Sequence, residues 1–161
     1  MSLDHKLLGI YLNDHLAGAT VGRELAGRAA GSNRDNEYGV FLERLQAEIA
    51  EDREALRELM DELDVGEDMI KTVFALVAER AGRLKLNGSL TSYSPLSRLV
   101  EIEGLLLGVN GKLSLWRALR ELDDPSLPDT RLDELERRAE RQCDELEDHR
   151  LMAAREAFED G

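Results

Sequence analysis

The clearest pattern in the chain is an apolar stripe between residues 37 and 64. Its positions alternate in steps of four and three residues, which is the spacing of one face of an α-helix. They are Tyr38, Leu42, Leu45, Ile49, Leu56, Leu59 and Leu63. The one step without an apolar residue holds Asp52. Because burying an unpaired charge is costly, Asp52 requires a cation, a metal or a hydrogen-bond network opposite it if this stripe faces a core.

Similar periodicities predict five helices and no sheet. Residues that favour the start of a helix precede three of these segments. They are Asn36, Ser94 followed by Pro95, and Asp129. Gly66 is the expected stop of the second helix. The predicted helices cover residues 3–30, 37–64, 67–86, 95–122 and 130–158, and residues 1–161 form a single domain.

The composition supports a core of packed helices, and the net charge excludes some classes of binding partner. Aromatic residues make up 4% of the chain and apolar residues 42%, so the core is expected to consist of aliphatic side chains on helices. A formal net charge of −13 disfavours nucleic acid and anionic membranes as partners. The single Cys143 and the lack of a long apolar run favour a cytoplasmic protein.

Four of the predicted helices are long, and the third is shorter. The short loops after the first and fourth helices predict two antiparallel hairpins, and residues 67–94 are long enough to return the chain to the opposite end of a bundle. This arrangement, with polar residues in mid-helix, resembles the ferritin-like superfamily over nearly the whole chain. The resemblance implies an all-α, ferritin-like four-helix bundle whose long crossover contains an extra short helix. A five-helix bundle in up-and-down order is the alternative.

The resemblance also implies candidate metal ligands, although the motif is degenerate. In that family each hairpin supplies a Glu and a Glu-x-x-His, which together surround two irons. Here the first helix has Asp14 and His15 in place of a Glu, and the second helix has no His. In the last helix Glu145 lies four residues before His149 instead of three. The candidates for a metal site are Asp52, Glu103, Glu48, His15 and His149.

Each of these residues also has an ordinary structural explanation. Asp52 can pair with His15, with Arg117 or with another arginine. Glu103 is expected to face the core and Glu101 the solvent, since residues two apart on a helix point in different directions. Glu48 is expected at the surface, His15 as a core histidine, and His149 at a bundle end.

Small residues on the first and fourth helices predict a close helix contact, either within the bundle or between subunits. They are Gly18, Gly22, Gly104, Gly108 and Gly111. The favoured hypothesis is a non-catalytic protein without a cofactor, dimeric, that acts through an interface or a small-ligand pocket. The alternative is a divergent metal-dependent oxidase or metal-storage protein that binds iron, manganese or zinc. A third hypothesis is a helical adaptor that binds an amphipathic helix of a partner.

Overall fold

The computed structural model describes residues 3–67 and 93–159. Within these residues the chain forms four α-helices and no strand, as predicted. The predicted helix over residues 67–86 lies outside the described residues except for Glu67, which is not helical. The four helices are α1 (His5–Ser32), α2 (Glu37–Glu62), α4 (Pro95–Arg120) and α5 (Asp129–Phe158).

Two of the predicted helix caps are confirmed and two predicted end signals are wrong. Asn36 accepts a hydrogen bond from the Tyr38 amide, and Ser94 forms a capping box with Ser97. At α5 the N-cap is Pro128, which has no side-chain acceptor, so Asp129 is already in the first helical turn. The turn after α2 uses Asp64, whose φ of 52° places it in the left-handed region that was expected of Gly66.

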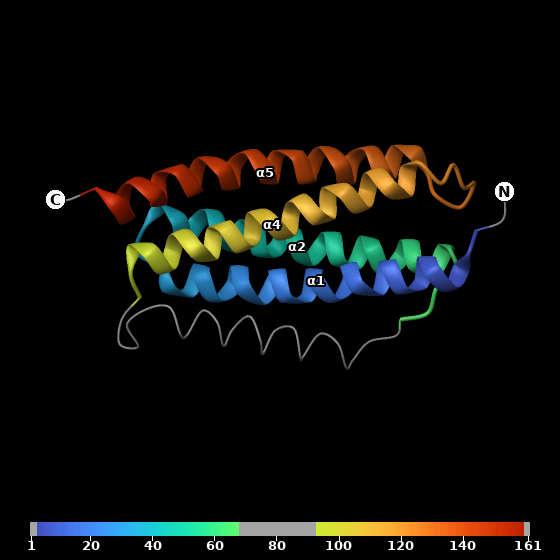
Figure 1. Ribbon diagram of the computed structural model, residues 1–161, viewed down its shortest axis with the longest axis horizontal. Coiled ribbons are helices and arrows are strands. Elements are labelled where there is room, and N and C mark those ends of the chain that lie inside the picture. The colour runs from blue at the N-terminus through green and yellow to red at the C-terminus, as the bar shows by residue number, and fades with distance from the viewer. Residues whose placement is uncertain (1–2, 68–92, 160–161) are drawn as a thin grey trace.

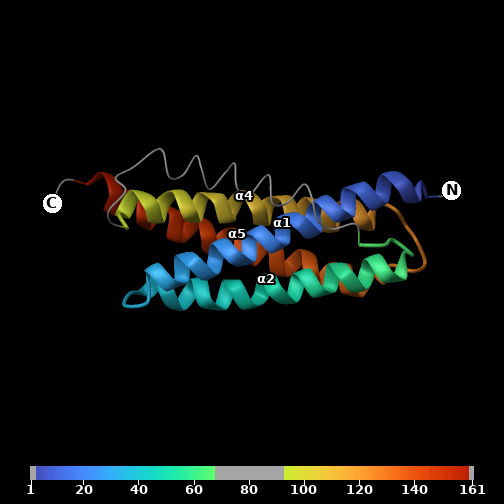
Figure 2. The same ribbon diagram turned by 90° about the horizontal axis from the view of Figure 1, so that it is seen from below.

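The helices form two antiparallel hairpins, α1 with α2 and α4 with α5, arranged side by side (Figure 1). Around the bundle the order is α1, α2, α5, α4, so that α2 and α4 are diagonally opposite. In both views α4 runs antiparallel to α1 and in the same direction as α2 (Figures 1 and 2). These directions fit both the predicted crossover and the alternative five-helix up-and-down order. In each of these topologies α4 has to run antiparallel to α1.

The core consists of two hydrophobic clusters, one towards each end of the bundle. On α2 the predicted stripe is confirmed at every position, since all its apolar residues are buried. Asp52 lies between Ile49 of one cluster and Leu56 of the other. Lys112 on α4 and Gln142 on α5 occupy the same level, so the two apolar clusters are separated by a polar layer.

The predicted orientations of Glu103 and Glu101 on α4 are wrong, although Leu99 and Leu113 of the same helix are buried. Leu96 is 46% exposed, and the Glu103 side chain is also 46% exposed, whereas neighbouring Ile102 is fully buried. Glu101, expected in solvent, has a side chain that is only 12% exposed. Apolar residues occur on several sides of α4, so its sequence is compatible with more than one buried face. No helix in the described parts of the chain is long and apolar enough to span a membrane.

Candidate functional site

The polar layer at the bundle centre is built by three helices that each place one polar residue on a buried stripe. On α2, Asp52 follows Ile49 by three residues; on α5, Gln142 follows Ala139 by three. On α4, Lys112 follows Val109 by three in the same way. The helical period therefore turns all three side chains towards the bundle axis. No residue of α1 is among the hydrogen-bond or ion-pair partners of Asp52, Lys112 and Gln142.

Lys112 reaches across the bundle diagonal to Asp52. Its Nζ lies 2.5 Å from Oδ2 of Asp52 and donates to it, and Nζ donates a second bond of 2.5 Å to Oε1 of Gln142. The Asp52 side chain is 1% exposed and that of Lys112 is 13% exposed. A carboxylate this deeply buried is compatible with the fold because its Oδ2 atom accepts from a cation and an amide.

Arg138 on α5 supplies a second positive charge. Its Nε lies 3.0 Å from Oδ1 of Asp52, close enough for an ion pair although the two groups are not aligned for a hydrogen bond. The other end of the guanidinium pairs with Glu51, where NH1 and Oε2 are 2.6 Å apart. Arg138 therefore connects the buried carboxylate of Asp52 to the exposed carboxylate of Glu51, the preceding residue of α2.

Gln142 links the layer to Glu48, one helical turn before Asp52. The Nε2 of Gln142 donates to Oε2 of Glu48 at 2.8 Å and lies 3.4 Å from Oδ2 of Asp52. The Glu48 side chain is 17% exposed, so it is more buried than predicted, and its other oxygen pairs with Arg141 at 3.2 Å. Glu48 and Asp52 thus belong to one network, whose donors are an amide, an ammonium and two guanidinium groups.

The electrostatics of the layer combine the effect of burial with that of an ion pair. Burial lowers the pKa of Lys112, and the neighbouring carboxylate of Asp52 acts in the opposite direction by favouring the charged ammonium. Cys143 is half-buried next to this layer, and burial raises the pKa of its thiol, which keeps it protonated and unreactive near neutral pH. Each carboxylate of the layer therefore already has a cationic partner within the chain.

Glu103 does not reach this layer. It precedes Lys112 by nine residues, which corresponds to about 13 Å along the helix. Its carboxylate lies 3.5 Å from NH1 of Arg150 on α5, and its side chain is about half exposed. Glu103 is therefore part of a surface ion pair at another level of the bundle.

The two histidine candidates also lie away from Asp52 along the bundle. His15 is half-buried on α1 and makes an edge contact with Tyr11, and burial lowers its pKa. His149 stacks on Phe41 with ring centroids 3.8 Å apart, and its Nδ1 lies 2.7 Å from the carbonyl oxygen of Glu145. Of the five sequence candidates, the structure brings together only Asp52 and Glu48.

The sequence interpretation did not identify Lys112, Gln142 or Arg138 as members of the site. For Lys112 and Gln142 the signal was present, because each fills a step between buried apolar residues, as Asp52 does on α2. Arg138 lies beside the α5 stripe, and its role depends on how α5 is rotated against α2, which the sequence does not state.

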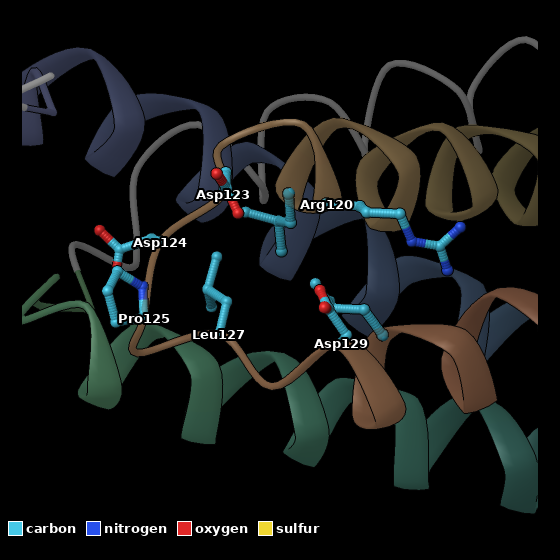
Figure 3. A pocket seen from close by; sticks show the side chains of 8 residues that line it. Arg120, Asp123, Asp124, Pro125, Leu127 and Asp129 are labelled. Carbon is cyan, nitrogen blue, oxygen red and sulfur yellow. The ribbon is translucent and has the colours of Figure 1, made fainter.

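A surface cavity of about 280 Å³ lies elsewhere, beneath the loop that joins α4 and α5. Figure 3 shows Asp123, Asp124 and Leu127 on that loop, with Arg120 extending along α4. Arg120 already pairs with Asp133 and Glu136. In residues 3–67 and 93–159 no group of three His, Cys, Asp or Glu side chains has an arrangement that could hold a metal ion.

No protein-family model matches the chain, and neither a curated protein nor a solved structure is significantly similar to it. The arrangement of the helices and the central polar layer are therefore the observations on which a functional proposal rests.

Proposed function

We propose that this protein is a non-catalytic, ferritin-like helical bundle whose central site is occupied by the ammonium group of Lys112. We propose further that the protein acts through its surface. The observation that carries the proposal is the 2.5 Å contact between Nζ of Lys112 and Oδ2 of Asp52 at the centre of the bundle. In a ferritin-like protein this level is where a divalent ion would be bound by carboxylates from several helices.

The donor set favours an ion pair over a metal. Divalent ions are bound by oxygen and nitrogen atoms with free lone pairs, whereas an ammonium and a guanidinium group have none to offer. Lys112 and Arg138 both approach Asp52, so a metal at this carboxylate would have to displace two cations. The central carboxylates then serve to fix the relative positions of α2, α4 and α5.

A surface role requires a partner, and a second copy of this chain is the partner that we propose. Small residues on α1 and α4 and several exposed apolar side chains, among them Val40, Leu107 and Phe158, are the features that support association. Sedimentation equilibrium gives the mass in solution, and a monomer at every accessible concentration would contradict the homodimer.

The second candidate is a divergent metal-binding protein that uses Asp52 and Glu48, since these carboxylates lie in one network. The substitution Asp52→Asn distinguishes the two functions. If the site is an ion pair, Asp52→Asn leaves Lys112 without its anion and lowers the free energy of unfolding by about 1 to 3 kcal/mol. Added Fe²⁺, Mn²⁺ or Zn²⁺ should then leave the melting temperature of the wild type unchanged.

Thermal melts of both proteins, with and without each metal, provide the measurement. Glu51→Gln is the matched control, because Glu51 is the adjacent carboxylate and also pairs with Arg138 but is 67% exposed; we expect it to change the stability by less than about 1 kcal/mol. A metal-dependent rise in the wild type that disappears in Asp52→Asn would overturn the non-catalytic proposal, because a ligand that binds the native state raises its stability.

A further inference from the structure

One side of α4 is open to solvent and uncharged in its middle. Residues in alternating steps of four and three share this side, because that is the spacing of one helix face. We call them the α4 outer stripe: Glu103, Leu107, Asn110, Ser114 and Arg117. Leu107 is 74% exposed, and Asn110 and Ser114 are exposed as well. The stripe therefore has a neutral centre between one acidic and one basic end.

The surroundings of Leu107 distinguish it from Val40, which is equally exposed at 74%. On α2, the residues three before, three after and four after Val40 are all charged and exposed: Glu37, Glu43 and Arg44. The corresponding neighbours of Leu107 are uncharged: Gly104, Asn110 and Gly111. Another helix can therefore cover Leu107 without burying a charge, which it cannot do at Val40.

The two polar side chains at the centre of the stripe are turned back onto their own helix. Nδ2 of Asn110 donates to the carbonyl oxygen of Leu106 at 2.9 Å, and Oγ of Ser114 donates to that of Asn110 at 3.0 Å. These donors stay paired when the stripe is covered, which lowers the cost of burying them. A Cβ atom on Gly111 would meet nothing within 4 Å, so a backbone can approach between Leu107 and Ser114.

Most of the negative charge lies on other helices. α2 contains nine acidic and three basic residues and α5 contains ten and six, whereas α4 contains two and four. A second copy of this chain, with a formal net charge of −13, is therefore repelled by α2 and α5. Two copies that meet through α4 experience less repulsion than two that meet through either of these helices.

The two charged ends of the stripe determine how two copies are oriented. Glu103 and Arg117 are fourteen residues apart, and Asn110 lies midway between them. Their side chains are 46% and 53% exposed, and each also pairs with residues of α5 in its own chain. Antiparallel stripes bring Glu103 of each copy nearest to Arg117 of the other, whereas parallel stripes bring like charges together.

We propose, on the basis of the homodimer proposed above, that two copies of the chain pack antiparallel through the α4 outer stripe, with the two-fold axis at Asn110. Leu107 of each copy then lies near Gly111 and Ser114 of the other. At the axis the two Asn110 side chains face each other. A carboxamide has two amide hydrogens and a carbonyl oxygen, so these side chains can pair reciprocally while each keeps its bond to Leu106.

Cysteine cross-linking in the full-length protein tests the position of the axis. In a Cys143→Ala background, Asn110→Cys should give a covalent dimer with a short bis-maleimide, because its two copies meet at the axis. Leu96→Cys is the matched control on the same helix, since Leu96 is 46% exposed but lies fourteen residues from Asn110. Its two copies would be about 42 Å apart. Ile10→Cys, at a position that is 55% exposed, is the control on α1.

Denaturing electrophoresis measures the rate of cross-linking at a concentration where sedimentation equilibrium shows a dimer. A rate for Asn110→Cys at least about tenfold above both controls supports the proposal. A dimer in which Leu96→Cys reacts as fast indicates parallel helices, and one in which Ile10→Cys reacts faster indicates a contact through α1. Either result overturns the antiparallel α4 contact and leaves the homodimer in place, whereas a monomer at every concentration overturns both.

Gly111→Leu gives a second readout that does not depend on cross-linking. The added side chain has free space within the chain, and Leu favours a helix more than Gly does, so the fold should be kept, as circular dichroism can verify. Because the side chain fills the space for the second helix, the dissociation constant of the dimer should rise at least about tenfold. Ala47→Leu, at an exposed position of α2, is the control and should leave it unchanged. An unchanged dissociation constant in Gly111→Leu would overturn the proposal.

Discussion

The two long interfaces between the hairpins, the α2/α5 seam and the α1/α4 seam, differ in the side chains that fill them. Along the α2/α5 seam, long charged side chains meet: Arg44 and Glu145 at 3.0 Å, and Arg141 and Glu48 at 3.2 Å. Along the α1/α4 seam, Gly104 faces Leu25 directly. The backbones of α1 and α4 accordingly approach more closely over their length than those of α2 and α5.

This difference explains where the polar layer can form. Between α2 and α5 the wider spacing accommodates side chains as large as Arg138 and Gln142, and α4 contributes Lys112 from across the diagonal. Between α1 and α4 the helices lie closer together, and no α1 side chain is among the partners of Asp52, Lys112 and Gln142. The α2/α5 seam thus contains a series of ion pairs, whereas the α1/α4 seam combines close helix packing with the ion pair of Arg28 and Glu101, 3.5 Å apart.

Removing the central cation should have the largest effect on stability. Lys112→Met leaves the carboxylate of Asp52 buried with only the misaligned Arg138 beside it, and we expect a loss of about 3 to 5 kcal/mol in the free energy of unfolding. The double variant Asp52→Leu with Lys112→Met should recover most of this loss, because it removes both charges.

Urea unfolding of the two variants measures these changes. Arg117→Met is the control on the same helix, since Arg117 is a cation whose side chain is 53% exposed, and it should cost less than about 1 kcal/mol. A double variant no more stable than Lys112→Met alone would mean that the layer is not organised around the Asp52–Lys112 pair.

The close approach at the α1/α4 seam predicts an intermediate effect. Ala29 lies one turn after Leu25 on α1 and is 1% exposed. Ala29→Leu adds three carbon atoms where the helices are close, and we expect it to lower the free energy of unfolding by about 1 to 3 kcal/mol. Ala47→Leu is the control, because Ala47 is exposed on α2. Equal stabilities of the two variants in urea unfolding would show that this seam is loosely packed.

The sequence predicts those parts of the structure that depend on one helix at a time. The α2 stripe with buried Asp52 and the caps at Asn36 and Ser94 follow from local spacing and local hydrogen bonds. The partners of Asp52 depend on how three helices are rotated against one another, which no single segment encodes. On α4, where apolar residues occur on several sides, the periodicity does not select one register, and Glu103 was therefore assigned to the wrong side.

The surface ion pairs of the α2/α5 seam should have the smallest effect. Arg131 on α5 pairs with Glu58 and Glu62 of α2, and all three side chains are partly exposed. Because water and ions screen such pairs, Arg131→Gln should lower the free energy of unfolding by less than about 1 kcal/mol. The difference from wild type should also vanish when urea unfolding is repeated at about 1 M NaCl, where the screening length is a few ångströms. A larger loss that salt leaves unchanged would mean that packing of the Arg131 side chain, and not its charge, holds this seam together.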